Sequence, residues 1–180
     1  MSRETSEYTI EQLVKSDNGR LTLGPVRAVV TTQAAYVFMM KVLHEHAPHA
    51  LKYAFYDMGY RVGEDLMSAI PVSGRDPEDA FRHVVETYRQ AGYGNLEVLE
   101  FDLSQAEARL AGTDLFETAV ARESGVYRTP RCVDHYSRGI FAGFMSNLLG
   151  QEVICEEIAC QYRGDARCEF MVLPYDANRR

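Results

Sequence analysis

The last part of the chain carries a dense set of potential metal ligands, and this set constrains the fold more than any other feature. Glu157, Cys160 and Cys168 follow the spacing E-x2-C-x7-C, and Cys132 lies upstream of them. All four cysteines fall between positions 132 and 168, and the first 131 residues contain none. Thiolates and a carboxylate are the ligands that zinc prefers. The pattern predicts that a zinc ion joins the segment around Cys132 to a C-terminal hairpin.

Two other interpretations of these cysteines remain open. They are buried free thiols, which behave as small hydrophobic groups, or a disulfide that joins Cys160 to Cys168. Residues 1–15 are polar and lack the apolar core of about 7 to 15 residues that a signal peptide needs. We therefore expect a reducing, cytoplasmic location, which disfavours the disulfide. Four protein ligands would leave no position for a bound water, so zinc is expected to be structural.

Length and charge limit the functions that this chain can have. Its 180 residues, 46% hydrophobic and 25% charged, are typical of one globular domain. No apolar run reaches the ~18 residues that span a membrane. The net charge is −7 and Lys and Arg form no block, so direct nucleic-acid binding is not expected. We expect a polar lead-in at 1–18, one domain at 19–176 and a polar tail at 177–180.

Hydrophobic periodicity and turn residues predict an α+β fold, an antiparallel sheet with helices packed on one face. Asp76 followed by Pro77 is typical of a helix start. Glycine pairs in two of the helices favour close helix packing: Gly59 with Gly63, and Gly139 with Gly143. Helices are predicted at 34–44, 47–70, 76–90, 113–122 with Thr113 as its cap, and 129–149, and strands at 21–32, 96–101, 106–110, 153–162 and 166–172.

The final hairpin would place two of the cysteines opposite each other. A turn centred on Gly164 pairs Cys160 with Cys168, so that one ion can contact both thiolates. Strict alternation puts Glu156, rather than Glu157, on the same strand face as Cys160. A ligand at Glu157 therefore requires a β-bulge or strong local twist.

The fourth ligand comes from the helix predicted to open at 129–132. Cys132 falls in its first turn, where free backbone amides favour the thiolate. His135, one turn later, is a chemically reasonable substitute for Cys132. Cys155 is expected to be a core or pocket-wall residue, because four ligands close the site without it.

The segment 157–172 resembles the signature that closes the 4-vinyl-reductase domain family. It reads Glu157-Ile-Ala-Cys160-Gln-Tyr-Arg-Gly-Asp-Ala-Arg-Cys168-Glu-Phe-Met-Val172. The resemblance extends to earlier segments and implies a fold similar to that of Golgi-transport tethering subunits. In phenol-sensing members three Cys and one Glu hold zinc, which implies Cys132, Glu157, Cys160 and Cys168 here. The earlier segments are Ala108-Arg109-Leu110, Glu117, Pro130-Arg131-Cys132, Gly139-Ile140-Phe141-Ala142-Gly143 and Leu149-Gly150.

The same phenol-sensing members enclose an apolar pocket beside the zinc, where a His and a Trp hold the phenol hydroxyl. This chain has no Trp, and the segment expected to supply the His reads Ala91-Gly92-Tyr93-Gly94. The chain departs from the family at these positions, and phenol is not the expected ligand; Tyr93 is the candidate that offers a hydroxyl instead. Tyr136 and Phe141 are candidate pocket walls, although each would serve equally well in core packing.

The resemblance implies three functions. The first is a zinc-containing sensing domain, similar to those of aromatic-responsive sigma-54-dependent activators, that binds a small apolar or aromatic ligand, forms a homodimer and signals to a regulatory partner. The second is a tetrapyrrole vinyl reductase or its accessory carrier, although no G-x-G-x-x-G turn, flavin signature or P-loop is present. The third is a non-enzymatic interaction subunit that dimerises through residues 34–70 and has a filled core.

Overall fold

The computed structural model describes residues 9–70, 72 and 74–176. The tail predicted at 177–180 and the first eight residues of the predicted lead-in lie outside the described residues. In chain order the elements are α1 (Ile10–Leu13), β1 (Val14–Asp17), β2 (Arg20–Leu23), β3 (Val26–Ala28), α2 (Gln33–His46), α3 (Leu51–Ala69), α4 (Pro77–Gln90), β4 (Asn95–Asp102), β5 (Glu107–Thr113), α5 (Phe116–Ser124), α6 (His135–Leu149), β6 (Val153–Ala159) and β7 (Cys168–Pro174).

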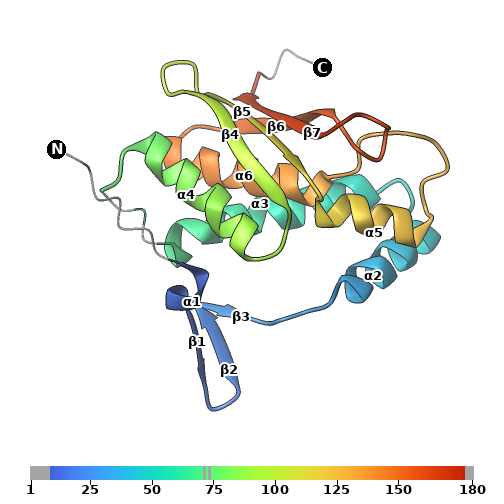
Figure 1. The fold of residues 1–180 in the computed structure, drawn as a ribbon, viewed down its shortest axis with the longest axis horizontal. Helices are drawn as coiled ribbons and strands as arrows, with labels where there is room; N and C mark the ends of the chain where they lie inside the picture. Colours follow the sequence, from blue (N-terminus) through green and yellow to red (C-terminus); the bar gives the residue numbers. More distant parts are fainter. Residues whose placement is uncertain (1–8, 71, 73, 177–180) are drawn as a thin grey trace.

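The larger sheet has four antiparallel strands in the order β4-β5-β7-β6. Figure 1 shows α4, α6 and α3 beneath this sheet, so the helices cover one of its faces. This arrangement confirms the predicted α+β fold. No helix among the described residues is long and apolar enough to cross a membrane.

Helices α3 and α6 pack against each other through small residues. A Cβ atom on Gly59 would overlap the backbone oxygen of Tyr136, and one on Gly143 would overlap that of Tyr60. Gly63 and Gly139 have equally close contacts on the facing helix, with Ile140 and Tyr56. The close packing predicted from the two glycine pairs is thus confirmed, and the pairs face each other across one interface.

Several element boundaries differ from the sequence predictions; the strand predicted at 21–32, for example, is divided into β2 and β3. Three further differences concern segments around the functional residues. Residues 10–17, expected to be irregular, form α1 and β1, and β1 joins β2 and β3 in a small antiparallel sheet that extends from the body (Figure 1). Thr113 does not cap α5, because it pairs with Asn95 in the larger sheet and the helix begins three residues later. The cap of α4 is as predicted: Asp76 accepts a 3.0 Å hydrogen bond from the Glu78 amide.

The third difference concerns the helix that carries Cys132 in the prediction. Helix α6 begins at His135, with Asp134 in the N-cap position, so Cys132 lies in the non-helical segment before it. Helix α6 begins at His135 because a side chain from α5 caps it there. The carboxylate of Glu117 accepts 2.8 Å hydrogen bonds from the amides of Tyr136 and Ser137, and so caps α6 from α5.

Candidate metal centre and the neighbouring cavity

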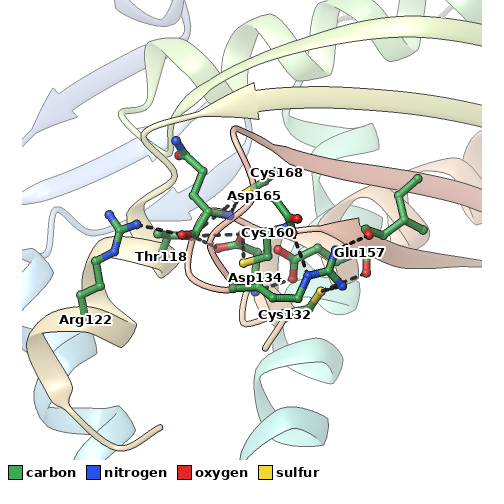
Figure 2. A network of polar contacts seen from close by, with 11 residues as sticks. Thr118, Arg122, Cys132, Asp134, Glu157, Cys160, Asp165 and Cys168 are labelled. Atoms are coloured by element: carbon green, nitrogen blue, oxygen red, sulfur yellow. Dashed lines mark hydrogen bonds and ion pairs between the residues drawn. The ribbon is translucent and has the colours of Figure 1, made fainter. Parts of the chain in front are cut away.

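Four side chains from three segments converge at one end of the larger sheet. One ligand atom from each of Asp134, Glu157, Cys160 and Cys168 lies within 4.8 Å of the others. Figure 2 shows them pointing toward one another beneath the turn that joins β6 to β7. Each is largely or fully buried. We call these four residues the metal-ligand group.

A β-bulge brings Glu157 to the same side as Cys160. The pairing of β6 with β7 shifts between Glu157 and Ala159, so Ile158 is the extra residue on its strand. Before the bulge Glu157 is buried and Glu156 exposed, and after it Cys160 is buried again. The bulge required by the E-x2-C spacing is therefore present. Beyond it, Ala159 pairs with Glu169 and β6 ends, so Cys160 lies just after the strand and Cys168 is the first residue of β7.

The turn after β6 is held in shape by Asp165. Its carboxylate accepts a 2.8 Å hydrogen bond from the backbone amide of Cys160 and a 2.7 Å bond from Nε of Arg163. Arg163 also donates to the backbone oxygen of Ile158 at 2.8 Å, so its side chain joins the bulge to the turn. The Cys160 backbone is thus fixed by contacts that leave its thiol free to face the other ligands.

Asp134 is the member of the metal-ligand group that sequence reasoning missed. Its carboxylate makes no hydrogen bond to α6, because Glu117 already caps that helix. Instead, Asp134 accepts hydrogen bonds from Oγ1 of Thr118 at 3.2 and 3.3 Å, and its backbone amide donates to Glu157 at 3.0 Å. An aspartate at a helix start ordinarily indicates a cap, so the sequence held no signal for this role.

The other candidates lie around the metal-ligand group. Cys132 is half-buried outside it, and its Sγ donates to the backbone oxygen of Glu157 at 3.2 Å. The His135 ring contacts Arg138 instead, with 3.4 Å between Nδ1 and the guanidinium. Cys155 is fully buried in the hydrophobic core, as expected.

Burial disfavours several negative charges within the metal-ligand group. Burial and the neighbouring Asp134 raise the pKa of Glu157 far above its usual range. Burial raises the pKa of Asp134 to about 6, and the hydrogen bond to Cys160 with burial raises that of Cys168. Cys160 is the exception, since the hydrogen bond from Cys168 lowers its pKa to about 5. Protons therefore offset the charge that a cation would otherwise neutralise.

The residues fit a zinc ion. Tetrahedral zinc with thiolate and carboxylate ligands needs ligand atoms roughly 3.3 to 3.8 Å apart, which a small contraction of this group provides. Oε1 of Glu157 is buried and has no hydrogen-bond partner among the described residues. A buried carboxylate oxygen without a partner is costly, and coordination to a metal would satisfy it. Bound zinc would supply a cation that holds the start of α6 against the final hairpin.

Zinc affinity is expected to rise with pH. Asp134, Glu157 and Cys168 have raised pKa values and retain protons that zinc must displace. Asp134 loses its proton near pH 6, so above that pH the protons come from Glu157 and Cys168. Each proton displaced from these two groups should raise the apparent association constant about tenfold per pH unit. Competition with a zinc chelator at pH 6, 7 and 8 measures this slope. A pH-independent affinity would contradict displacement of protons from these groups.

An apolar cavity of about 420 Å³ lies between the small sheet and the helical body. One wall comes from residues 10–33, among them Leu21 and Val30, and the other from α3, α4 and α6. Polar residues, among them Thr32, Gln33 and Thr87, also line the cavity. Its aromatic lining residues are Tyr36, Tyr88, Tyr93 and Phe116.

Of the three predicted ligand-binding residues, Tyr93 lines this cavity and the other two do not. Tyr93 lines it, stacked on Tyr88 with 4.9 Å between ring centroids. Tyr136 packs behind Tyr93, with its centroid 6.0 Å away. Phe141 is fully buried in the core, where it contacts Tyr88 and Phe170.

Hydrogen bonds connect the cavity wall to the start of α6. The hydroxyl of Tyr88 lies 2.7 Å from Oγ of Ser137, which in turn donates to Glu117 at 2.7 Å. Burial and the nearby charge of Asp134 raise the pKa of Glu117 to about 8. Next to it on α5, Thr118 contacts the metal-ligand group. The cavity and this group therefore share α5 and the α6 N-terminus as neighbours.

Comparison with known proteins agrees with the sequence resemblance. The model of the 4-vinyl-reductase domain family matches residues 116–174, which include the metal-ligand group and α6. This match confirms the resemblance for that segment. No curated protein matches the sequence.

Three solved structures share the fold. The crystal structure of the phenol-responsive sensory domain of the transcription activator PoxR with phenol is similar over 92% of this chain and 86% of that chain, with a TM-score of 0.80 and 20% identity. A trafficking protein particle complex subunit 3 from Naegleria fowleri, covalently bound to palmitic acid, aligns over 80% and 95%, with a TM-score of 0.54 and 15% identity. A vinyl-4-reductase family protein from Methanocaldococcus jannaschii aligns over 83% and 85%, also at 0.54 and 15%.

Proposed function

Because residues 116–174 match the 4-vinyl-reductase domain family, we propose that this protein binds a small apolar or aromatic molecule and signals its presence to a partner. The observation that carries the proposal is the apolar cavity of about 420 Å³. Ligand pockets typically measure about 300 to 1,000 Å³ and are lined mainly by apolar and aromatic groups with a few polar atoms. A cavity of this kind also favours ligand binding over the filled core of a purely interacting subunit.

The cavity has room for a ligand larger than one ring. An engineered protein cavity of roughly 150 Å³ already holds benzene, and this one is nearly three times larger. The hydroxyl groups of Tyr36 and Tyr93 offer hydrogen bonds to a single polar group on such a ligand. We therefore propose a ligand of two or more fused rings, or of comparable size, with one hydroxyl or carbonyl group.

The proposal includes a structural metal. We propose that zinc is held by Glu157, Cys160 and Cys168, with Asp134 favoured over Cys132 as the fourth ligand because its carboxylate lies within the metal-ligand group. Zinc would then fix α6, one wall of the cavity, to the final hairpin.

Signal transfer is proposed to use the N-terminal segment. A ligand in the cavity would contact both residues 21–33 and the helical body, so occupancy would bias the position of the small sheet. Hydrogen exchange of residues 20–33 measures this effect. Added ligand is expected to slow their exchange, and unchanged exchange would contradict the proposed route.

Filling the cavity is expected to block ligand binding. Val62 lines the cavity from α3, so Val62→Phe places a ring in the space that the ligand needs. With 1-naphthol as the probe, calorimetry should show 1:1 binding to the wild-type protein and at least a tenfold loss in the variant, about 1.4 kcal/mol or more. Met58→Phe, one turn earlier on α3 and outside the lining, is the control. Equal affinities in all three proteins would contradict this site.

A homodimer is also proposed. Four apolar side chains on the N-terminal part of the molecule are exposed: Val29 at 81%, Val30 at 88%, Phe38 at 69% and Val42 at 37%. A dimer interface that covers these side chains would remove apolar surface from water, which favours association. Light scattering should give twice the 20.4 kDa chain mass, and Phe38→Ser should shift the protein toward the monomer. A wild-type protein that is monomeric at high micromolar concentration would contradict the proposal.

A further inference from the structure

A second hollow, of about 540 Å³, lies between the turn that joins α2 to α3 and the segment that joins α5 to α6. It shares no lining residue with the apolar cavity. Its size falls within the range of small-molecule sites. We call it the basic groove, because its charged lining residues are all cationic or histidine: His44, His49, Lys52, Arg128 and Arg131.

The basic groove is positively charged, although the protein as a whole is negatively charged. The chain has 26 acidic and 19 basic residues, yet none of the described residues that line the groove is a carboxylate. Cations gathered in a concave surface focus a positive potential there. An anionic ligand would therefore be attracted to this groove although the protein as a whole is acidic.

The cations of the basic groove also lack ion-pair partners. Within the described part of the chain, Lys52, Arg128 and Arg131 form no ion pair with a carboxylate. Six arginines elsewhere in the chain do form such pairs, namely Arg61, Arg82, Arg89, Arg109, Arg163 and Arg167. The positive charge in the groove thus remains available to a ligand.

Local contacts hold the Arg131 side chain in place. Its guanidinium lies over the ring of Tyr127, 5.4 Å from the centroid, and donates a 2.7 Å hydrogen bond to Oγ1 of Thr129. Such contacts reduce the conformational entropy that binding would otherwise remove. Arginine presents a planar fork of donors that matches phosphate oxygens.

From these features we propose that the basic groove binds the phosphate group of a small organic molecule. Several cations around one hollow suit a group that carries about two negative charges better than a single carboxylate. A long nucleic acid is disfavoured, because its many phosphates would meet the acidic remainder of the surface. This site is independent of the apolar cavity and of the proposed function.

Inorganic phosphate is the probe that tests the site. We expect saturable changes in the amide NMR signals of residues 49–52 and 126–131 when phosphate is added to the full-length protein at constant ionic strength. Arg128→Gln/Arg131→Gln should weaken binding at least tenfold, and Lys52→Gln should weaken it to a smaller extent. All three side chains are exposed, so the variants are expected to keep the wild-type melting temperature.

The control is a double variant that changes the net charge by the same amount as Arg128→Gln/Arg131→Gln. Arg20→Gln/Arg27→Gln replaces two exposed arginines of the small sheet, and it should bind phosphate within twofold of the wild-type protein. The proposal is overturned by changes that do not saturate, by equal losses in the two double variants, or by unchanged binding in Arg128→Gln/Arg131→Gln. Tighter binding of a 20-nucleotide single strand than of phosphate at physiological salt would overturn it in favour of a nucleic-acid surface.

Discussion

Cys160→Ala is expected to abolish stoichiometric zinc binding and to destabilise the fold. The variant removes a thiolate from the centre of the metal-ligand group and leaves Asp134 and Glu157 buried without a cation. Removal of one partner from a buried charged group costs about 3 to 5 kcal/mol. For a domain of this size, about 3 kcal/mol corresponds to a fall of roughly 6 to 12 °C in Tm. Elemental analysis and calorimetry measure the two effects.

Two matched variants identify the fourth ligand. Asp134→Asn should lose zinc as Cys160→Ala does, whereas Cys132→Ala should retain it, because the Cys132 thiol is bonded to the Glu157 backbone oxygen outside the group. The reverse result would assign the fourth position to Cys132, as the family resemblance implies. A Cys160→Ala protein that keeps both its zinc and its Tm would disprove the metal centre.

Gly143→Ala is expected to have the other large effect. The added methyl group would overlap the backbone oxygen of Tyr60 on α3, and backbone atoms cannot move aside as a flexible side chain can. The two helices would have to separate along their shared interface. Overpacking costs about 1 to 3 kcal/mol, and we expect the upper end of this range here because the overlap is with backbone. Denaturant unfolding monitored by circular dichroism measures this cost.

Gly150→Ala provides the comparison. Gly150 lies at the end of the same helix, where a Cβ atom would meet nothing within 4 Å and only its φ of +64° favours glycine. It should therefore cost only about 1 kcal/mol, the lower end of the cost of a left-handed conformation for a residue with a Cβ atom. If Gly143→Ala costs no more than Gly150→Ala, the close contact between α3 and α6 is wrong.

Local signals predicted the parts of the site that lie close together in the sequence. The turn around Gly164 joins the last two strands next to the Ala159–Glu169 pair, and it brings the thiols of Cys160 and Cys168 close together. The E-x2-C spacing required a bulge before Glu157 could face the other ligands, and the bulge occurs between Glu157 and Ala159. In both cases the determining residues are neighbours in the chain.

The roles of Asp134 and Glu117 could not be predicted, because they depend on each other across two helices. Asp134 has the residue type and position of an N-cap, but Glu117 caps the helix in its place. The family resemblance implied a pocket, but the wall from residues 10–33 could not be predicted, because their sequence gives no sign of where the small sheet docks. The sequence therefore did not identify Tyr36 as a lining residue, whereas comparison with the family pointed to the segment that holds Tyr93.

Native mass spectrometry of the full chain with 1-naphthol tests the central claim most directly. If the protein is a zinc-containing ligand-sensing domain, the spectrum should show a species that carries one zinc ion and one 1-naphthol per chain. The Val62→Phe variant should lack the bound 1-naphthol. A wild-type spectrum that shows the chain without 1-naphthol at a saturating concentration would contradict the proposed function.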